Sequence, residues 1–288
     1  MLTNGISHPD ALAFDGPNEL WVGNGSPAHP GIAEYISHPG GKPALINEYT
    51  LSGFPPEGLA FDSHGNLWAA GGVGVVEFSA ASLGSYPREI CTITSPSWLD
   101  GPDGLAFDSH GNLWVSNYNN RVLLEFPARS LSTSHPQPRR HIQQPAGATP
   151  YAITFDAHGN LWVADQNDKV YEYAAGTLGT TNTPAAVINM SPFITGGTLG
   201  VAFDPHGNLW VSTTGGTLRP EGMVYEYAAN TLGTTNTPRA HWVARGGQHE
   251  CQSGNLGHCL FAAAIRYRCE TGSRVPEEPC RNNACVTT

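Results

Sequence analysis

Carboxylate side chains recur at one position of a repeated sequence pattern. Asp10, Glu57 and Asp103 each directly follow a proline, and each opens a short apolar run. Carboxylate oxygens are hard ligands, so three of them brought together would suit Ca²⁺ or Mg²⁺. The chemistry that these residues offer is divalent-cation binding, provided that the fold places them side by side.

A second polar position lies fourteen residues after the first in every copy of the pattern. The pairs are Asp10 with Asn24, Glu57 with Gly71, Asp103 with Asn117, Tyr151 with Asp165, and Leu199 with Thr213. Amide and carboxylate oxygens at this second position are also suited to a hard cation. Asn117 therefore joins the three carboxylates as a candidate metal ligand.

Both positions belong to a repeat that occurs five times. Each copy contains an apolar run that ends at an Asp, then a tight turn, then a second apolar run that contains a Trp. The tryptophans are Trp21, Trp68, Trp114, Trp162 and Trp210, and successive ones are 46 to 48 residues apart. A fixed period of this length indicates a propeller or a solenoid.

Each copy is predicted to form four strands. Asp and Gly are typical of tight hairpin turns, and in four copies the third residue after the Asp is a Gly, as at Gly111. Asn18 takes this place in the first copy, and Asn is the next most tolerant residue for a positive φ. A third run with a central Glu follows, as in residues 75–78, and then a fourth run, as in residues 89–94.

We therefore predict an all-β fold, a β-propeller of four-stranded antiparallel blades. The propeller spans residues 9–243, with five legible blades at about 9–51, 56–94, 102–142, 150–188 and 198–243. Residues 244–288 are a Cys-rich tail. Three interpretations of the tail are open: a degenerate sixth blade, a disulfide cap, or sequence outside the fold.

The predicted strand directions place both polar positions on one rim of the propeller. The first strand of a blade runs from the proline to the Asp turn, and the second strand returns. Asp10, Glu57 and Asp103 come from three consecutive blades, so we expect them to converge at the mouth of the central channel. The alternative is that an Asp or Glu after a proline serves only the turn between blades.

The repeats Pro56-Glu-Gly-Leu-Ala-Phe-Asp-Ser-His-Gly-Asn-Leu-Trp68 and Pro102-Asp-Gly-Leu-Ala-Phe-Asp-Ser-His-Gly-Asn-Leu-Trp114 resemble NHL-type propeller repeats. They are also similar to the gluconolactonase (senescence-marker) family and, more loosely, to streptogramin lyases. In the gluconolactonase family a Glu of a Glu-Gly motif and an Asp of a Pro-Asp-Gly motif bind the catalytic metal. The resemblance thus implies Glu57 and Asp103 as the first metal ligands, with Asp10 and Asn117 next.

Two functions from different classes are compatible with these residues. The first is a metal-assisted hydrolase of the lactonase type that uses Ca²⁺ or Mg²⁺ on a small ester or lactone. Asp103 and Asp165 are its candidate catalytic residues, and Asn24 and Tyr151 its candidate substrate contacts. The second is a non-catalytic NHL-type propeller that binds a protein or a glycan on the same rim.

The sequence argues against other catalytic chemistry. The resemblance to streptogramin lyases implies a catalytic His directly after the proline, and no copy has one. The Gly-x-Ser-x-Gly elbow of α/β-hydrolases is missing from the chain. The turn histidines His64, His110, His158 and His206 are expected to be exposed, and the turn aspartates Asp15, Asp62, Asp108, Asp156 and Asp204 are expected to cap turns.

The composition limits the kinds of partner that we expect this protein to bind. The net charge is −10, with lysine only at Lys42 and Lys169, which speaks against nucleic-acid binding. No apolar run is long enough to span a membrane as a helix. We expect a monomer.

The cysteines bear on the cellular compartment. Five of the six lie in the tail, at Cys251, Cys259, Cys269, Cys280 and Cys285. Disulfides in an extracytoplasmic compartment are the favoured interpretation, and a zinc site with His258 is the rival. Residues 1–8 lack the basic start and apolar core of a signal peptide, so either the protein is cytoplasmic or a leader precedes this sequence.

Overall fold

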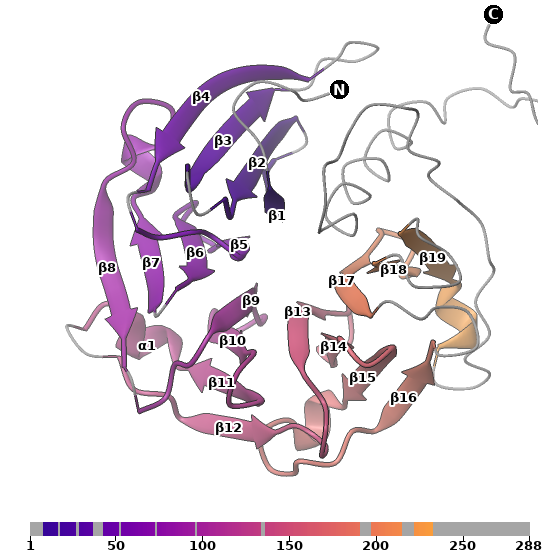
Figure 1. The fold of residues 1–288 in the computed structure, drawn as a ribbon. Coiled ribbons are helices and arrows are strands. Elements are labelled where there is room, and N and C mark those ends of the chain that lie inside the picture. The colour runs from indigo at the N-terminus through magenta and orange to yellow at the C-terminus, as the bar shows by residue number, and fades with distance from the viewer. Residues whose placement is uncertain are drawn as a thin grey trace, which may run out of the picture.

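A computed structural model shows the predicted β-propeller (Figure 1). It describes residues 8–232 except 17, 27–28, 37–42, 52, 73, 96, 134–135, 191–196 and 215–221. Nearly all regular structure in this part is β, with the single-turn helix α1 (Ala128–Leu131) and three 3₁₀ turns as exceptions. None of the helices in the described residues is long and apolar enough to cross a membrane.

The strands form five antiparallel sheets, one for each repeat. Blade 1 contains β1 (Pro9–Asp15), β2 (Glu19–Asn24), β3 (Gly31–Ile36) and β4 (Ala44–Thr50). Blade 2 contains β5 (Gly58–Phe61), β6 (Leu67–Gly71), β7 (Gly74–Phe78) and β8 (Glu89–Thr94). Blade 3 contains β9 (Pro102–Phe107), β10 (Leu113–Asn117), β11 (Val122–Phe126) and β12 (Arg140–Gln143).

The last two blades follow the same order. Blade 4 contains β13 (Pro150–Phe155), β14 (Leu161–Asp165), β15 (Lys169–Tyr173) and β16 (Ala186–Asn189). Blade 5 has three described strands, β17 (Thr198–Phe203), β18 (Leu209–Thr213) and β19 (Met223–Tyr227). The predicted fourth strand of blade 5 lies outside the described residues. The tail 244–288 and its cysteines also lie outside them, so its three interpretations are not tested.

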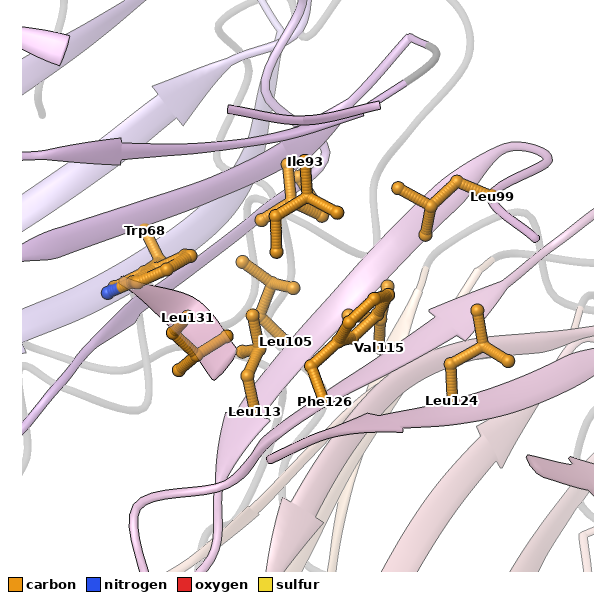
Figure 2. Close-up of a cluster of buried hydrophobic side chains, with 11 residues drawn as sticks. Trp68, Ile93, Leu99, Leu105, Leu113, Val115, Leu124, Phe126 and Leu131 are labelled. Atoms are coloured by element: carbon orange, nitrogen blue, oxygen red, sulfur yellow. The ribbon is translucent and has the colours of Figure 1, made fainter. Parts of the chain in front are cut away.

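Apolar layers between successive blades form the core. Figure 2 shows the layer between blades 2 and 3, where Trp68 and Ile93 of blade 2 meet Leu105, Val115 and Phe126 of blade 3. An edge-to-face aromatic pair recurs at each such interface: Trp21–Phe61, Trp68–Phe107, Trp114–Phe155 and Trp162–Phe203, with ring centroids 5.7–6.2 Å apart. Each pair contributes about 0.5–1.5 kcal/mol beyond the burial of its area.

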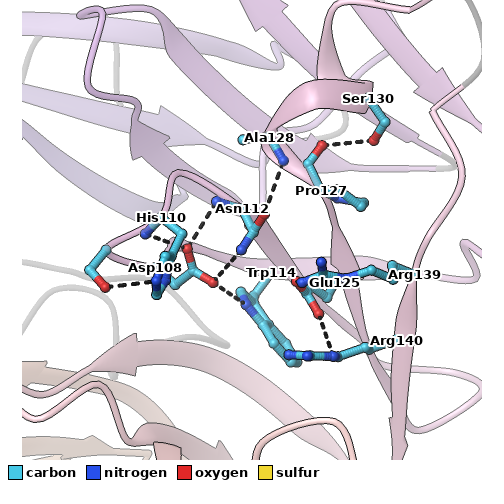
Figure 3. A network of polar contacts seen from close by, with 11 residues as sticks. Asp108, His110, Asn112, Trp114, Glu125, Pro127, Ala128, Ser130, Arg139 and Arg140 are labelled. Carbon is cyan, nitrogen blue, oxygen red and sulfur yellow. Dashed lines mark hydrogen bonds and ion pairs between the residues drawn. The ribbon is translucent and has the colours of Figure 1, made fainter.

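One carboxylate organises each hairpin turn in blades 2 to 5. In blade 3, Asp108 Oδ1 accepts the backbone N–H groups of His110 and Asn112, each at 2.9 Å. Its Oδ2 accepts the Asn112 amide at 2.8 Å and the Trp114 indole N–H at 3.3 Å (Figure 3). Asn112 Oδ1 in turn accepts the N–H of Ala128 at 3.0 Å, which ties the turn to the segment after β11.

The same bonds recur at Asp62, Asp156 and Asp204, so the predicted role of these aspartates as turn caps is confirmed. The glycines in the third place, Gly65, Gly111, Gly159 and Gly207, have φ of 75° to 80° as predicted. The histidines of these turns, His64, His110, His158 and His206, are exposed, as expected.

The first turn differs from the prediction. Asn18 does not have a positive φ; Gly16 does, at 75°. The reason is the register, because Asp15 pairs with Glu19 and leaves a shorter loop than the one between Phe61 and Leu67 in blade 2. The left-handed residue is therefore needed earlier in the turn.

We predict that Asp108→Ala destabilises the protein by about 2–4 kcal/mol, because four donors lose their acceptor in a partly buried turn. The matched control is His110→Ala in the same turn. Its exposed ring makes this change cost about 0.5 kcal/mol or less. Urea denaturation of both variants measures the difference, and equal losses would show that the carboxylate does not hold the turn.

Candidate functional site

The three candidate carboxylates lie at the start of the innermost strand of blades 1, 2 and 3. In blade 1 the pairing of β1 with β2 shifts between Pro9 and Ala11, so Asp10 falls within an irregularity of the ladder. In blade 3 the pairing of β9 with β10 shifts at Asp103 in the same way. Such bulges redirect a side chain from its regular course. Glu57 directly precedes β5 and donates its backbone N–H to the Ala70 carbonyl at 2.7 Å.

Burial and neighbouring negative charge raise the pKa values of two of the three carboxylates. Burial raises the pKa of Glu57 to about 7, and the negative charge of Asp10 contributes to the rise. Burial raises the pKa of Asp103 well above its ordinary value, and the charges of Glu57 and Asp10 add to this effect. Like charges that cannot both be solvated hold protons to higher pH. The three carboxylates therefore interact electrostatically, and their convergence on a common point stays a prediction.

A turn-capping role does not account for Glu57 or Asp103. The carboxylate of Asp108 accepts two backbone N–H groups, as a turn cap should. In contrast, hydrogen bonds among the described residues include none to the carboxylate of Glu57 or of Asp103. The described hydrogen bonds therefore give no support to the alternative interpretation of this pair as turn caps.

Glycines let the inner strands approach closely enough to bring the acids together. A Cβ on Gly58 would lie 1.9 Å from the backbone oxygen of Asp103, and a Cβ on Gly104 would lie 2.5 Å from that of Tyr151. No side chain fits at either distance. In blades 2 and 3, the Gly after the acid is therefore required by the close contact with the next blade, whereas blade 1 has Ala11 at this position.

Tyr151 lies beside this cluster. Burial raises its pKa, and the charge of Asp103 is the next contribution. Its ring makes an edge-to-face contact with Tyr118, with centroids 5.3 Å apart. The predicted role of Tyr151 as a substrate contact stays a prediction, and the position is suited to it. Tyr118, which sequence reasoning missed, follows the Asn117 position directly in the chain.

Ser116 is a second residue that sequence reasoning missed. Its fully buried hydroxyl accepts the N–H of Gly104 at 2.8 Å and donates to the carbonyl of Tyr151. It thus connects the irregular start of β9 to the innermost strand of blade 4. The repeat carried only a weak signal for this role, since the residue two places after the Trp is Ala70 in blade 2 and Ala164 in blade 4.

The residues at the second polar position, Asn24, Asn117 and Asp165, bind the backbone of their own blade. We call these hydrogen bonds the clasp. Asn24 accepts the N–H of His8 at 2.9 Å, Asn117 accepts that of Asp100 at 3.2 Å, and Asp165 accepts that of Thr149. Asn117 also donates to the Trp98 carbonyl at 3.1 Å. All three side chains are buried. Each joins the end of the second strand to the segment that enters the first strand of its own blade.

Because of these bonds, the best candidates for cation ligands are the carboxylates of Asp10, Glu57 and Asp103. The oxygens of Asn117 and Asp165 that would face a ligand are engaged with backbone N–H groups. Burial raises the pKa of Asp165, although the N–H groups of Asn167 and Thr149 oppose the rise. The metal role of Asn117, the catalytic role of Asp165 and the substrate role of Asn24 stay predictions, and this geometry adds no support to them.

The carboxylate cluster fits a hard cation in its chemistry. Asp10, Glu57 and Asp103 supply only oxygen donors, which suits Ca²⁺ or Mg²⁺. Among the residues that the structure describes, no three His, Cys, Asp or Glu side chains already have the arrangement of a metal site. A cation here therefore requires the carboxylates to rotate toward a common point.

Comparison with known proteins identifies the fold. The streptogramin B lyase structure has a TM-score of 0.54 and 17% identity, over 81% of this chain and 72% of the lyase. A propeller in the nidogen/laminin complex has a TM-score of 0.55 and 18% identity, over 81% and 78% of the two chains. A putative gluconolactonase has a TM-score of 0.56 and 14% identity, over 78% and 76%.

Sequence comparison adds no relative. No protein-family model matches the chain, and no curated protein matches it. The structural neighbours include a lyase, a putative gluconolactonase and a propeller from a protein complex at nearly equal similarity, so the comparison does not distinguish catalysis from binding. What they show is that this chain has a β-propeller fold similar to those of streptogramin lyases, gluconolactonase-like proteins and the nidogen/laminin complex.

Proposed function

We propose that this protein is a divalent-metal-assisted hydrolase that acts on a small ester or lactone at the mouth of the propeller channel. The observation that carries the proposal is the interaction of three carboxylates from successive blades: the charge of Asp10 helps to raise the pKa of Glu57, and the charges of Glu57 and Asp10 help to raise that of Asp103. A cation among them would relieve this repulsion, whereas blade packing has no need for it. The similarity to a putative gluconolactonase is compatible with this activity.

The residues have distinct tasks in this proposal. Asp10, Glu57 and Asp103 would hold Ca²⁺ or Mg²⁺, which supplies polarisation of the ester carbonyl and a more acidic water. Without a cation the pKa of Glu57 is raised to about 7, and a bound cation would lower it, so that the ionised carboxylate could serve as a ligand at neutral pH. Asp103 is the candidate proton acceptor. Tyr151 and Tyr118 offer an aromatic wall for the organic part of the substrate.

A specific observation also favours a binding propeller. The Trp98 ring is 42% exposed, and its backbone carbonyl is fixed by the amides of Asn117 and Asn120, the first of which belongs to the clasp at the mouth. An exposed aromatic ring on a fixed loop is a suitable contact for a protein or a glycan. This second function does not require a cation, so metal binding separates the two.

We expect wild-type protein to bind Ca²⁺ or Mg²⁺, and Glu57→Gln and Asp103→Asn each to weaken this binding tenfold or more, about 1.4 kcal/mol. Each change removes one charged ligand and keeps the size of the side chain. Asp100→Asn is the matched control, because Asp100 is an exposed acid three residues before Asp103. The affinity of the Asp100→Asn variant for Ca²⁺ or Mg²⁺ should equal that of wild type. Calorimetric titration with each ion measures all four proteins.

The titration is followed by hydrolysis assays on a panel of small esters and lactones, with EDTA and with each ion added back. Activity that needs the ion and falls in Glu57→Gln supports the hydrolase. A wild type that binds neither ion below millimolar concentration would exclude the metal site, and the binding propeller would then be the better interpretation. Metal binding without hydrolysis of any substrate in the panel would support the metal site and contradict the proposed hydrolase activity.

Glu57 also predicts how stability depends on pH. Its pKa is about 7 in the fold against an ordinary 4.5, so the folded state keeps this proton to higher pH than the unfolded chain. Stability is therefore lost as the pH rises from 4.5 through 7. Asp103, whose pKa is also raised, acts in the same direction.

In EDTA, Glu57→Gln should raise the melting temperature at pH 8 and change it little near pH 4.5. The gain is at most about 3 kcal/mol, from the size of the pKa difference. Glu89→Gln, at an exposed acid on β8, is the matched control and should show no such difference between the two pH values. If Glu57→Gln and wild type had the same melting temperature at both pH values, this would contradict the raised pKa of Glu57.

A further inference from the structure

Two arginines of blade 3 share one buried carboxylate. Arg139 directly precedes β12, the outermost strand of its sheet, and Arg140 is the first residue of that strand. Arg139 Nη2 forms an ion pair with Glu125 Oε1, and Arg140 Nε lies 3.4 Å from Glu125 Oε2 (Figure 3). The Glu125 side chain is fully buried, whereas the two arginine side chains are 42% and 38% exposed. Both guanidinium groups are therefore anchored by a buried group and still reached by solvent.

A buried Glu at this position of the repeat does not need two arginines. The same position, opposite the Trp of the second strand, holds Glu34 in blade 1 and Glu77 in blade 2, which are 7% and 9% exposed. Glu34 accepts the side-chain amide of Asn47 at 2.7 Å, and Glu77 accepts that of Asn66 at 2.9 Å. Among the residues that the structure describes, neither of these two acids forms an ion pair with an arginine. The arginine pair of blade 3 thus exceeds what the position requires.

The two guanidinium groups keep unused donors. A guanidinium carries about five N–H donors, and the described contacts use one nitrogen of Arg139 and one of Arg140, both toward Glu125. The two positive charges also exceed the single negative charge of Glu125. The other acid drawn in Figure 3, Asp108, has its oxygens engaged by four donors of its own hairpin. Donors and positive charge are therefore left over for a ligand.

The structure holds both arginines in place before any ligand arrives. The backbone N–H of Arg139 donates to the Glu125 carbonyl at 2.7 Å, which fixes the entry to β12. The stem of Arg140 lies against the connector after β15, because a Cβ on Gly179 would be 2.2 Å from Arg140 Cδ. Arg140 is thus confined between Glu125 of its own blade and Gly179 of blade 4. A side chain that is already confined loses less conformational entropy when it binds a ligand.

Blade 3 also carries most of the described positive charge of an acidic protein. The net charge of the chain is −10. The described Lys and Arg residues outside blade 3 are Arg88 and Lys169, and those within it are Arg121, Arg129, Arg139 and Arg140. Positive charge that is concentrated in one sector raises the local concentration of anions there. The ligand that this wall of the propeller favours is therefore an anion.

We propose that Arg139 and Arg140 bind a phosphate group, either as the free ion or as the terminal group of a monoester. A phosphate group carries a charge of about −1.5 to −2 at pH 7 and three strong acceptor oxygens, so it can accept N–H groups from two guanidiniums at once. A carboxylate has one charge and two oxygens, which a single guanidinium already matches. The phosphate approaches from solvent, on the side away from Glu125, because that carboxylate repels it.

The proposed phosphate site lies at the opposite end of the strands from the channel mouth. Glu125 pairs with Trp114 near the hairpin turn of blade 3, where the Trp114 indole donates to the turn carboxylate of Asp108. Asp103 lies at the other end of the blade, at the start of β9. Phosphate binding at the arginines is therefore independent of the cation that we propose at the mouth, and EDTA separates the two in an experiment.

Calorimetric titration of the full chain with inorganic phosphate, in EDTA and at constant ionic strength, tests the proposal. We expect wild type to bind phosphate with a Kd of about 1 mM or lower, and to bind acetate about tenfold more weakly or less. Methyl phosphate is titrated in parallel to distinguish the two sources. Equal affinity for both probes identifies the terminal group of a monoester, and binding of inorganic phosphate alone identifies the free ion. A wild type that binds phosphate no more tightly than acetate would overturn the proposal.

Glu125→Gln separates a ligand site from a structural ion pair. The change removes the like charge behind the arginines, keeps the size of the side chain and leaves both guanidinium groups in the protein. Phosphate should then bind about threefold more tightly or better, because repulsion is lost and donors are freed. If the arginines serve only to neutralise Glu125, the affinity for phosphate will not rise, and this result would contradict the proposal.

The arginines are removed one at a time in the Glu125→Gln protein, so that no buried carboxylate is left without a partner. Arg140→Gln and Arg139→Gln should each weaken phosphate binding about tenfold or more relative to Glu125→Gln alone. The matched control is Arg88→Gln in the same background, which makes an equal change of charge at an exposed arginine of blade 2. Its affinity should stay within about twofold of Glu125→Gln. An equal loss in all three proteins would show a general charge effect and overturn the site.

Discussion

The bond from the turn carboxylate to the Trp indole is the contact on which the blades depend. A single side chain such as Asp156 binds two turn N–H groups with one oxygen and the Trp162 indole, at 3.1 Å, with the other. The same group therefore fixes the hairpin and the orientation of the largest core side chain. That Trp is the surface on which the next blade packs its Phe, so local turn chemistry sets the geometry between blades.

Blade 1 shows what replaces this contact where it is missing. Its shorter turn gives the Trp21 indole no hydrogen-bond partner, although the ring is buried. Instead Trp21 stacks on Tyr49 of β4, with centroids 6.1 Å apart and planes 9° from parallel. A buried N–H without an acceptor costs about 1–3 kcal/mol, and aromatic stacking offsets part of that cost. The departure of the first repeat from the consensus is thus a change in how the Trp is held.

The repeat made the fold predictable, and the same repetition limited what could be predicted at the site. The five copies share the same turn and strand residues. The strand order, most of the turn caps and the exposed histidines could therefore be predicted from the residues. Asn117 and Asp165 were different, because their residue types suit a cation and a backbone clasp equally well. In the structure, oxygens of Asn117 and Asp165 accept the backbone N–H groups of Asp100 and Thr149, which lie in connecting segments outside the repeat. Asn18 was misjudged for a related reason, since loop length rather than residue type decided where the positive φ falls.

The electrostatic interaction of the acids is a consequence of how closely the inner strands approach. Gly58 and Gly104 bring the backbones of neighbouring blades so near that no side chain could separate them, and the acids one residue earlier are carried along. Ser116 then fixes that approach with two hydrogen bonds. The rigid blades hold together carboxylates whose pKa values burial and mutual repulsion raise, a state that favours the unfolded chain above neutral pH. Uncharged residues at Glu57 and Asp103 would avoid this cost, and the cation that we propose would offset it.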